Sequence, residues 1–428
     1  MSRADRPIFR PMRGARPNPS TLCAIVSAPP RATPASRLRP RPYTARVLSF
    51  LATFASSALV TLWLVYLCRR WPGAAMDDKL DDPQKVHRVP APRIGGIGIV
   101  MGLLIGAALV WGFAHTGSVL MMMLMLACAM PAFMSGLIHD FTDRLRPRGR
   151  LIATAVSAVL AFAVLDAQVT RSDIPGLDLI LATGLGSLLI TSLAVAGIAN
   201  AINIIDGLNG LASMCVLIML GGIAYVAGEV GDELVLGMAL AGIGAVLGFF
   251  IWNYPGGLIF LGDGGAYFLG FYVAELCILL LARNPGVSGL FALLVCIYPI
   301  VETVFSAWRR FWLRSQPATL PDGIHLHTLV YRRLVRWAVG EQDAKAIVRA
   351  NSMSSPYLWL LCSASVAPAM LFWDNPPMLG AMILLFAVTY VILYRQIVRF
   401  RSPRWLRRSP RSAGVNRSRD DAGDNQDS

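Results

Sequence analysis

Apolar stretches close to the length of a bilayer crossing recur along most of this chain. Of its 428 residues, 55% are hydrophobic and 15% are charged, whereas roughly a quarter of the residues in soluble domains are charged. Window hydropathy therefore predicts an all-α polytopic membrane protein with about eleven transmembrane helices. The predicted spans are 47–68, 94–115, 118–138, 151–168, 178–199, 207–228, 233–252, 258–282, 286–306, 356–374 and 378–397.

Both ends of the chain have compositions that cannot build a hydrophobic core. Residues 1–46 are rich in Arg, Pro, Ala and Ser, and residues 398–428 begin basic and end acidic. We predict disordered segments at both ends, flanking a transmembrane domain at 47–397. Two alternatives stay open for residues 1–46: a transit peptide, or a mis-assigned start upstream of Val47.

The distribution of positive charge predicts which side of the membrane each loop faces. The net charge is +14, and Arg residues gather in the connections 69–93, 139–150 and 307–355. Lys and Arg favour cytoplasmic loops, so this side is expected to be the cytoplasm. The basic residues are divided among loops between spans, which argues against nucleic-acid binding. The polar motifs described next all fall on this same side.

Asn200 to Leu211 (NAINIIDGLNGL) interrupts the apolar sequence between two predicted spans. Asn203 and Asp206 are three residues apart and share a face if the segment is helical. Their oxygen atoms suit Mg²⁺, which takes few protein ligands and completes its shell with phosphate and water. The alternative is a short loop in which Asn and Asp act as turn formers.

Asp263 lies among glycines inside an apolar run, in the sequence FLGDGGAYFLG from Phe260 to Gly270. A buried carboxylate without a cation or hydrogen-bond donors is unfavourable. We therefore expect a metal ion at Asp263. The alternative is glycine-mediated helix packing in which Asp263 bonds to a neighbouring helix.

Three further motifs carry cationic or titratable side chains. Lys85, His87 and Arg93 precede a span that opens with two glycines, which suits phosphate or anionic lipid. His139 and Asp140 end another span, where the pair suits proton transfer or a metal environment. His325 and His327 stand at alternate positions of the long basic loop and suit phosphate contacts, or a transition metal as the alternative. The remaining candidates are Asp143, which is alternatively a solvated side chain, and Glu302, expected to pair with a nearby Arg.

Taken together, these motifs resemble those of the bacterial polyprenyl-phosphate N-acetylhexosamine-1-phosphate transferases. The resemblance covers roughly residues 47–395 and rests on five motifs in order. They are Lys85-Val86-His87 with Pro92 to Gly96, Gly136 to Asp143, Asn200 to Leu211, Phe260 to Gly270, and His325-Leu326-His327. Each is weak alone, and the ordered set is specific.

The resemblance implies a reaction, its partners and a location. A phosphate oxygen of undecaprenyl phosphate would attack the β-phosphorus of a UDP-sugar such as UDP-N-acetylglucosamine, and UMP would leave. This step initiates a cell-surface glycan on the cytoplasmic face of the bacterial inner membrane. The implied cofactor is Mg²⁺, with Mn²⁺ as an alternative, and a homodimer is left open.

The resemblance also implies roles for individual residues. Asp263 would be the main metal ligand, assisted by Asn203. Catalytic roles would fall to Asp140, His139, Asp143 and Lys85. The residues implied in substrate binding are Asp206, Asn209, Phe260, His325, His327, His87 and Arg93.

The chain departs from the family pattern at three positions. Most members have two adjacent acids where this chain has His139-Asp140, so we expect Asp140 to stay essential and His139 to replace the first acid. Asn209 stands where an acid is usual, and Thr328 replaces a histidine. The change at Thr328 argues against the related phospho-N-acetylmuramoyl-pentapeptide transferases, which are kept as an alternative. A transporter and an inactive membrane scaffold are the alternatives from other classes.

Overall fold

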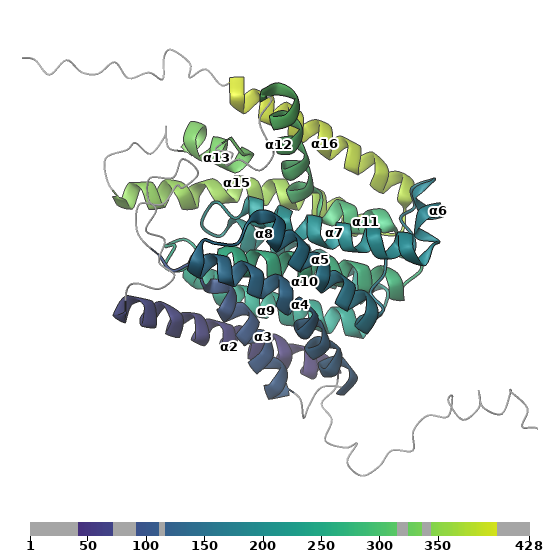
Figure 1. The fold of residues 1–428 in the computed structure, drawn as a ribbon, viewed down its shortest axis with the longest axis horizontal. Helices are drawn as coiled ribbons and strands as arrows, with labels where there is room; N and C mark the ends of the chain where they lie inside the picture. The colour runs from purple at the N-terminus through teal and green to yellow at the C-terminus, as the bar shows by residue number, and fades with distance from the viewer. Residues whose placement is uncertain (1–41, 72–90, 111–115, 315–323, 336–343, 400–428) are drawn as a thin grey trace, which may run out of the picture. The chain divides into compact units, whose positions relative to one another are not determined.

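The structure is a computed structural model that describes residues 42–71, 91–110, 116–314, 324–335 and 344–399. All the regular elements within these ranges are helices (Figure 1), which confirms the predicted all-α class. The first of them begins at Pro42, upstream of the predicted start of the first span at Val47. The last of them ends at Arg399, two residues into the predicted disordered segment 398–428. The remainder of both predicted disordered segments lies outside the described residues.

The helices follow one another closely along the chain. In order they are α2 (Pro42–Arg70), α3 (Gly95–Val110), α4 (Thr116–Thr142), α5 (Pro147–Leu165), α6 (Leu177–Leu181), α7 (Gly184–Ile205), α8 (Leu211–Glu229), α9 (Glu233–Asn253), α10 (Gly262–Arg283), α11 (Gly289–Val295), α12 (Ile297–Arg314), α13 (Leu326–Leu329), the π-helix η2 (Val330–Val335), α15 (Ala344–Leu371) and α16 (Pro376–Arg399).

Among the described helices, eight are long and apolar enough to cross a membrane. A ninth span results if α11 and α12, which are bent by 71° at their junction, count as one. The predicted number of eleven is not confirmed. Helix α3 has only 16 residues, and the N-terminal half of α15 carries Asn351 and several serines.

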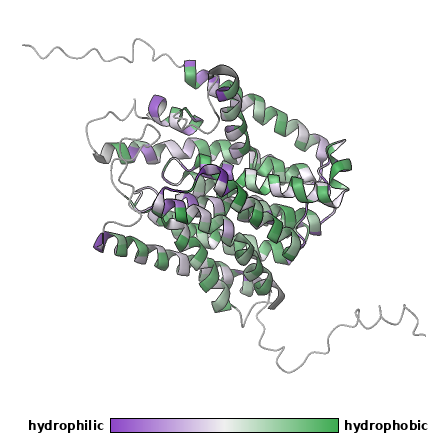
Figure 2. Ribbon diagram, viewed as in Figure 1, coloured by the Kyte–Doolittle hydropathy of each residue, from purple (hydrophilic) through white to green (hydrophobic). Residues whose placement is uncertain are grey.

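Helix α10 is the centre of the bundle. Nearly all of its side chains are buried, and α3, α4, α5, α7, α8 and α9 all pack against it. Figure 2 shows hydrophobic residues along most of the surrounding helices. Burial of these apolar faces against one another holds the helices around α10.

Small residues bring three neighbouring helices into close contact with α10, as is common in membrane bundles. A Cβ atom placed on the glycine of α3, α4 or α10 at each contact would lie within 2.6 Å of the opposing backbone. The contacts are Gly96 of α3 with Gly265, Gly136 of α4 with Asp263 and Gly264, and Gly270 of α10 with Ala199 of α7.

Several helix boundaries differ from those predicted, and the differences place the polar motifs. Helix α4 extends to Thr142 and α7 extends to Ile205, while α10 begins only at Gly262. His139 and Asp140 therefore lie in the last turn of α4. Asn203 lies in the last turn of α7, and Asp263 lies in the first turn of α10.

Candidate active site

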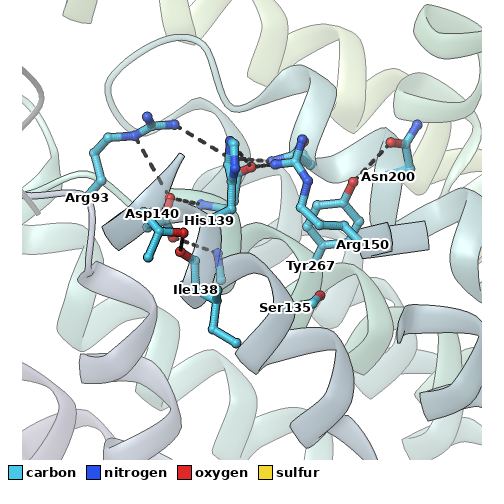
Figure 3. Close-up of polar contacts among 12 residues, drawn as sticks. Arg93, Ser135, Ile138, His139, Asp140, Arg150, Asn200 and Tyr267 are labelled. Atoms are coloured by element: carbon cyan, nitrogen blue, oxygen red, sulfur yellow. Dashed lines mark hydrogen bonds and ion pairs between the residues drawn. The ribbon is translucent and has the colours of Figure 1, made fainter. Parts of the chain in front are cut away.

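Polar side chains from distant segments meet where α4 and α7 end and α10 begins (Figure 3). The sequence predicted that these motifs would share one side of the membrane, and the structure brings several of them into contact. The residues that meet are Arg93, His139, Asp140, Arg150, Asn203 and Asp263.

Asp263 is the residue on which these contacts centre. It is 8% exposed, and Arg150 forms an ion pair with its carboxylate. The Asn203 amide donates to Oδ1 at 3.0 Å, and a guanidinium nitrogen of Arg93 lies 3.6 Å from the same oxygen. His139 Nε2 lies 3.8 Å from Oδ2. The buried negative charge is thus compensated by cations from other segments, as its position in an apolar run requires.

Asp140 binds the N-terminus of helix α10. Its Oδ1 accepts the Asp263 N–H and its Oδ2 accepts the Gly264 N–H, both at 2.9 Å. These N–H groups belong to the first turn of α10 and have no partner within the helix. A carboxylate there satisfies them and interacts favourably with the helix dipole. Asp140, whose side chain is only 1% exposed, therefore fixes the turn that carries Asp263.

A short backbone pairing holds Arg93 beside the two carboxylates. Phe260 N–H donates to Pro92 O at 2.8 Å, and Gly95 N–H donates back to Phe260 O at 2.9 Å. Gly262 has a φ of +76°, and a Cβ there would contact the Arg93 carbonyl and Asp140 Oδ2. Glycine is therefore required at this turn, which brings the segment before α3 onto the start of α10.

Arg150 also belongs to this candidate site, although the sequence indicated it only as one of the Arg residues of a loop. It lies in the first turn of α5 after Pro147, with its side chain 9% exposed. Its guanidinium carbon lies 5.6 Å from the centre of the Tyr267 ring. Tyr267 in turn donates to Asn200 Oδ1 at 3.2 Å. The sequence signal for Arg150 was a cation at the start of an apolar helix. That signal did not identify Asp263 as its partner, because the contact forms only when the helices pack together.

Asp206 and Asn209 lie on the connection after α7 and have different surroundings. Burial raises the pKa of Asp206 to about 7, although the Arg93 guanidinium acts to lower it. Asn209 is 2% exposed. Its backbone N–H donates to Asn351 Oδ1 at 2.8 Å, and its side chain donates to Pro255 O at 3.2 Å. Asn209 therefore ties this connection to α15, and its predicted nucleotide contact stays a prediction.

His325 and His327 stand together at the start of α13. Their rings are parallel, with centroids 5.4 Å apart. His325 Nδ1 lies 3.1 Å from Glu302 Oε1. The His327 ring lies against Gly207, where a Cβ would be 2.4 Å from Nε2. The histidine pair therefore contacts the connection that carries Asp206.

The remaining predicted residues are Phe260, Asp143, Lys85 and His87. Phe260 is half-buried and takes part in the backbone pairing with Pro92 and Gly95. Asp143 is exposed and follows α4 with a φ of +52°. Lys85 and His87 lie outside the described residues, so their roles stay predictions.

The chemistry of this cluster fits an ion that takes few protein ligands. No group of three or more His, Cys, Asp or Glu side chains is arranged for a metal within the described ranges. Mg²⁺, however, is commonly held by one or two carboxylates and substrate phosphates. Asp263 already attracts positive charge from Arg150 and Arg93. Asn203 now donates its N–H₂ group to Asp263, so its amide would have to turn over to offer oxygen to the same ion.

The chain is similar to known transferases over more than half of its length. The model of glycosyl transferase family 4 matches residues 121–281, which include the acids of α4 and α10 and the connection after α7. A probable undecaprenyl-phosphate N-acetylglucosaminyl 1-phosphate transferase of Bacillus subtilis is 30% identical over 288 residues, or 66% of this chain and 77% of that protein. The chain belongs to glycosyl transferase family 4.

Two further relatives of this glycosyl transferase show how far the similarity extends. A decaprenyl-phosphate N-acetylglucosaminephosphotransferase of Mycolicibacterium smegmatis is 27% identical over 382 residues, or 82% of this chain and 86% of that protein. A phospho-N-acetylmuramoyl-pentapeptide-transferase of Geobacillus is 29% identical over 243 residues, or 54% of this chain and 73% of that protein. The family resemblance predicted from the five motifs is confirmed.

Proposed function

We propose that this protein transfers an N-acetylhexosamine-1-phosphate, with N-acetylglucosamine as the first candidate sugar, from a UDP-sugar to undecaprenyl phosphate. A phosphate oxygen of the lipid attacks the β-phosphorus of the donor, the bond between the two donor phosphates breaks, and UMP leaves with that electron pair. The product is a lipid-linked sugar pyrophosphate that initiates a cell-surface glycan. The relatives named for polyprenyl-phosphate N-acetylglucosamine-1-phosphate transfer support this reaction.

The proposal rests on the cationic side chains that surround Asp263. A buried carboxylate stands with Arg93, His139 and Arg150 at the ends of apolar helices. Phosphoryl transfer depends chiefly on positioning and on neutralising charge on the phosphate oxygens. A cationic cluster at the end of a membrane bundle meets that need, since one substrate is a lipid and the other is water-soluble.

His139 in place of the usual acid is compatible with this reaction. The second pKa of a phosphate monoester is about 6, so the lipid phosphate is largely dianionic at neutral pH. The attacking oxygen therefore carries no proton that a base must remove. His139, which faces Asp263 Oδ2 at 3.8 Å, adds a donor or a positive charge to the cluster when it is protonated.

Mg²⁺ is part of the proposal, with Asp263 and Asn203 as the residues that would hold it. When bound, the ion would neutralise charge on the donor's pyrophosphate. Arg93 and Arg150 would then be available to contact phosphate oxygens, because guanidinium groups bind them through paired N–H donors. We place this site on the cytoplasmic side of the inner membrane from the Arg-rich connections at the same helix ends.

The reaction is tested with the full-length protein in membranes or nanodiscs. Radiolabelled UDP-N-acetylglucosamine is supplied with undecaprenyl phosphate, and label is measured in a butanol-extractable lipid with Mg²⁺, with Mn²⁺ and with chelator. Labelled lipid and an equal amount of UMP, both lost with chelator, are expected. Failure with every UDP-N-acetylhexosamine tried would overturn the proposal, provided that a relative assayed in parallel is active.

One alternative donor belongs in the same assay. Relatives named phospho-N-acetylmuramoyl-pentapeptide-transferase match this chain over a shorter part of its length, and the chain has Thr328 where a histidine is usual in that group. UDP-N-acetylmuramoyl-pentapeptide is therefore expected to give no labelled lipid. Efficient transfer from this donor would reassign the substrate while leaving the reaction class unchanged.

A further inference from the structure

Glu302 is a completely buried carboxylate near the predicted histidine pair. It lies on α12 and is 0% exposed. Its Oε1 lies 3.1 Å from His325 Nδ1 and accepts the Leu326 N–H at 3.0 Å. Its Oε2 accepts the Tyr390 hydroxyl at 2.8 Å. Glu302 thus joins α12 to the start of α13 and to α16.

These contacts determine which nitrogen of His325 carries a proton. The Leu326 amide and the Tyr390 hydroxyl both donate to Glu302, which favours its ionised form. A carboxylate only accepts hydrogen bonds, so His325 Nδ1 must carry a proton to bond with it. Ser306 Oγ lies 3.1 Å from the same nitrogen and can act as a second acceptor. Nε2 is then the ring nitrogen left for a ligand.

The surroundings of His325 combine one negative charge with several donors. The groups on neighbouring elements are Glu302, Ser306 and Arg309 on α12, His327 on α13, and Tyr390 and Tyr394 on α16. Arg309 donates to Ile324 O at 2.7 Å. Among the described residues of this group, Glu302 is the carboxylate that contacts His325 Nδ1.

The histidine pair is continuous with the candidate active site. The His325 ring lies parallel to that of His327, and His327 packs against Gly207, the residue after Asp206. A change in the position of His325 would therefore be transmitted to the connection between α7 and α8. The two stacked imidazole rings of His325 and His327 lie between Glu302 and this connection.

We propose that Glu302 is a positioning residue that acts through His325. It holds the imidazole by Nδ1 and orients Nε2, which donates to a phosphate oxygen when it too carries a proton. This inference rests on the proposed function. That oxygen belongs either to the donor's pyrophosphate or to the lipid phosphate, and the two sources share the same chemistry.

A double-mutant cycle in the transfer assay tests this dependence. The variants are Glu302→Gln, His325→Ala and the two combined, each in the full-length protein. At metal sites, loss of the partner that orients a ligating histidine lowers activity about 10- to 100-fold, and a loss of similar size is expected for Glu302→Gln. The combined variant should be no less active than His325→Ala alone. Losses that multiply would overturn the proposal.

The chain provides a matched control in Glu275. This residue lies on α10, is 0% exposed, and neither carboxylate oxygen has a hydrogen-bond partner among the described residues. Glu275→Gln makes the same change in a buried helix and is expected to retain activity. The two substrates are titrated separately in each variant. A raised KM for the UDP-sugar assigns the phosphate oxygen to the donor, and a raised KM for the lipid assigns it to the acceptor.

A spectroscopic measurement tests the inference without any substrate. The chain contains five histidines, so ¹⁵N-labelled histidine in the nanodisc-embedded protein gives few signals, and His325→Ala identifies the relevant one. Neutral His325 is expected to carry its proton on Nδ1. A neutral form protonated on Nε2 would overturn the proposal. If no donor is a substrate, the proposed function fails, and this measurement still decides the role of Glu302.

Discussion

The Asp140 carboxylate caps the helix that carries Asp263. Its two oxygens accept the N–H groups of Asp263 and Gly264 at 2.9 Å each. Both carboxylate oxygens are engaged by the first turn of α10. The essential role that the sequence predicted for Asp140 is therefore better explained by its effect on the position of Asp263.

Asp140→Asn should lower both stability and activity. The amide keeps one acceptor oxygen but places an N–H₂ group against the second backbone N–H. Loss of a helix cap costs about 0.5–2 kcal/mol, so a lower unfolding temperature is expected together with reduced kcat. The pH profile of the residual activity should keep its shape, because no base has been removed. If Asp140→Asn instead abolished the fall in activity at acidic pH and left the unfolding temperature unchanged, Asp140 would be identified as a base.

Arg150→Met should destabilise the protein, and Mg²⁺ should restore part of the loss. Removing one partner of a buried ion pair costs about 3–5 kcal/mol when the other charge is left unpaired, and a smaller loss is expected here because Arg93 and His139 still face Asp263. Thermal unfolding with and without Mg²⁺ measures both effects. The variant Arg150→Met/Asp263→Asn is the control, since it removes both charges and should be less destabilised and indifferent to Mg²⁺. An unchanged unfolding temperature for Arg150→Met would contradict the assigned pair.

The sequence was sufficient to predict the helices and several residues that meet around Asp263. The predicted spans fall on helices, because long apolar runs leave a chain few alternatives in a membrane. Two of them are divided, 178–199 between α6 and α7 and 286–306 between α11 and α12. Asp263 was identifiable because a carboxylate in such a run requires a counter-charge. The number of membrane spans was harder to predict than the positions of the helices. Helix α3 is short, α11 and α12 are bent at their junction, and α15 carries polar residues.

The contacts between helices could not be predicted from the sequence. The pairing of Arg150 with Asp263 and the cap formed by Asp140 join residues that local patterns do not relate. Glu302 was expected to pair with an Arg, and its hydrogen-bond partners proved to be His325, Leu326 and Tyr390. Each contact depends on how the helices pack, which periodicity and hydropathy do not specify.

Gly136→Ala should destabilise the protein although alanine is the better helix former. Its Cβ would lie 2.5 Å from backbone atoms of Asp263 and Gly264, so α4 and α10 must separate. Overpacking of this kind costs about 1–3 kcal/mol. Gly197→Ala in α7 is the control, because its Cβ would meet nothing within 4 Å and should stabilise the helix by about 0.5–1 kcal/mol. Equal unfolding temperatures for the two variants would contradict the close approach at Gly136.

Asp206 should make the stability of the protein fall as the pH rises. Burial raises its pKa in the folded state to about 7, whereas an unperturbed Asp has a pKa of about 3.9. Between these values the folded state binds more protons than the unfolded state, so the free energy of unfolding decreases with increasing pH. Unfolding temperatures measured from pH 4 to pH 8 should fall in the wild type and fall less in Asp206→Asn. The same slope in both proteins would show that Asp206 is ionised throughout this range, held so by the Arg93 guanidinium.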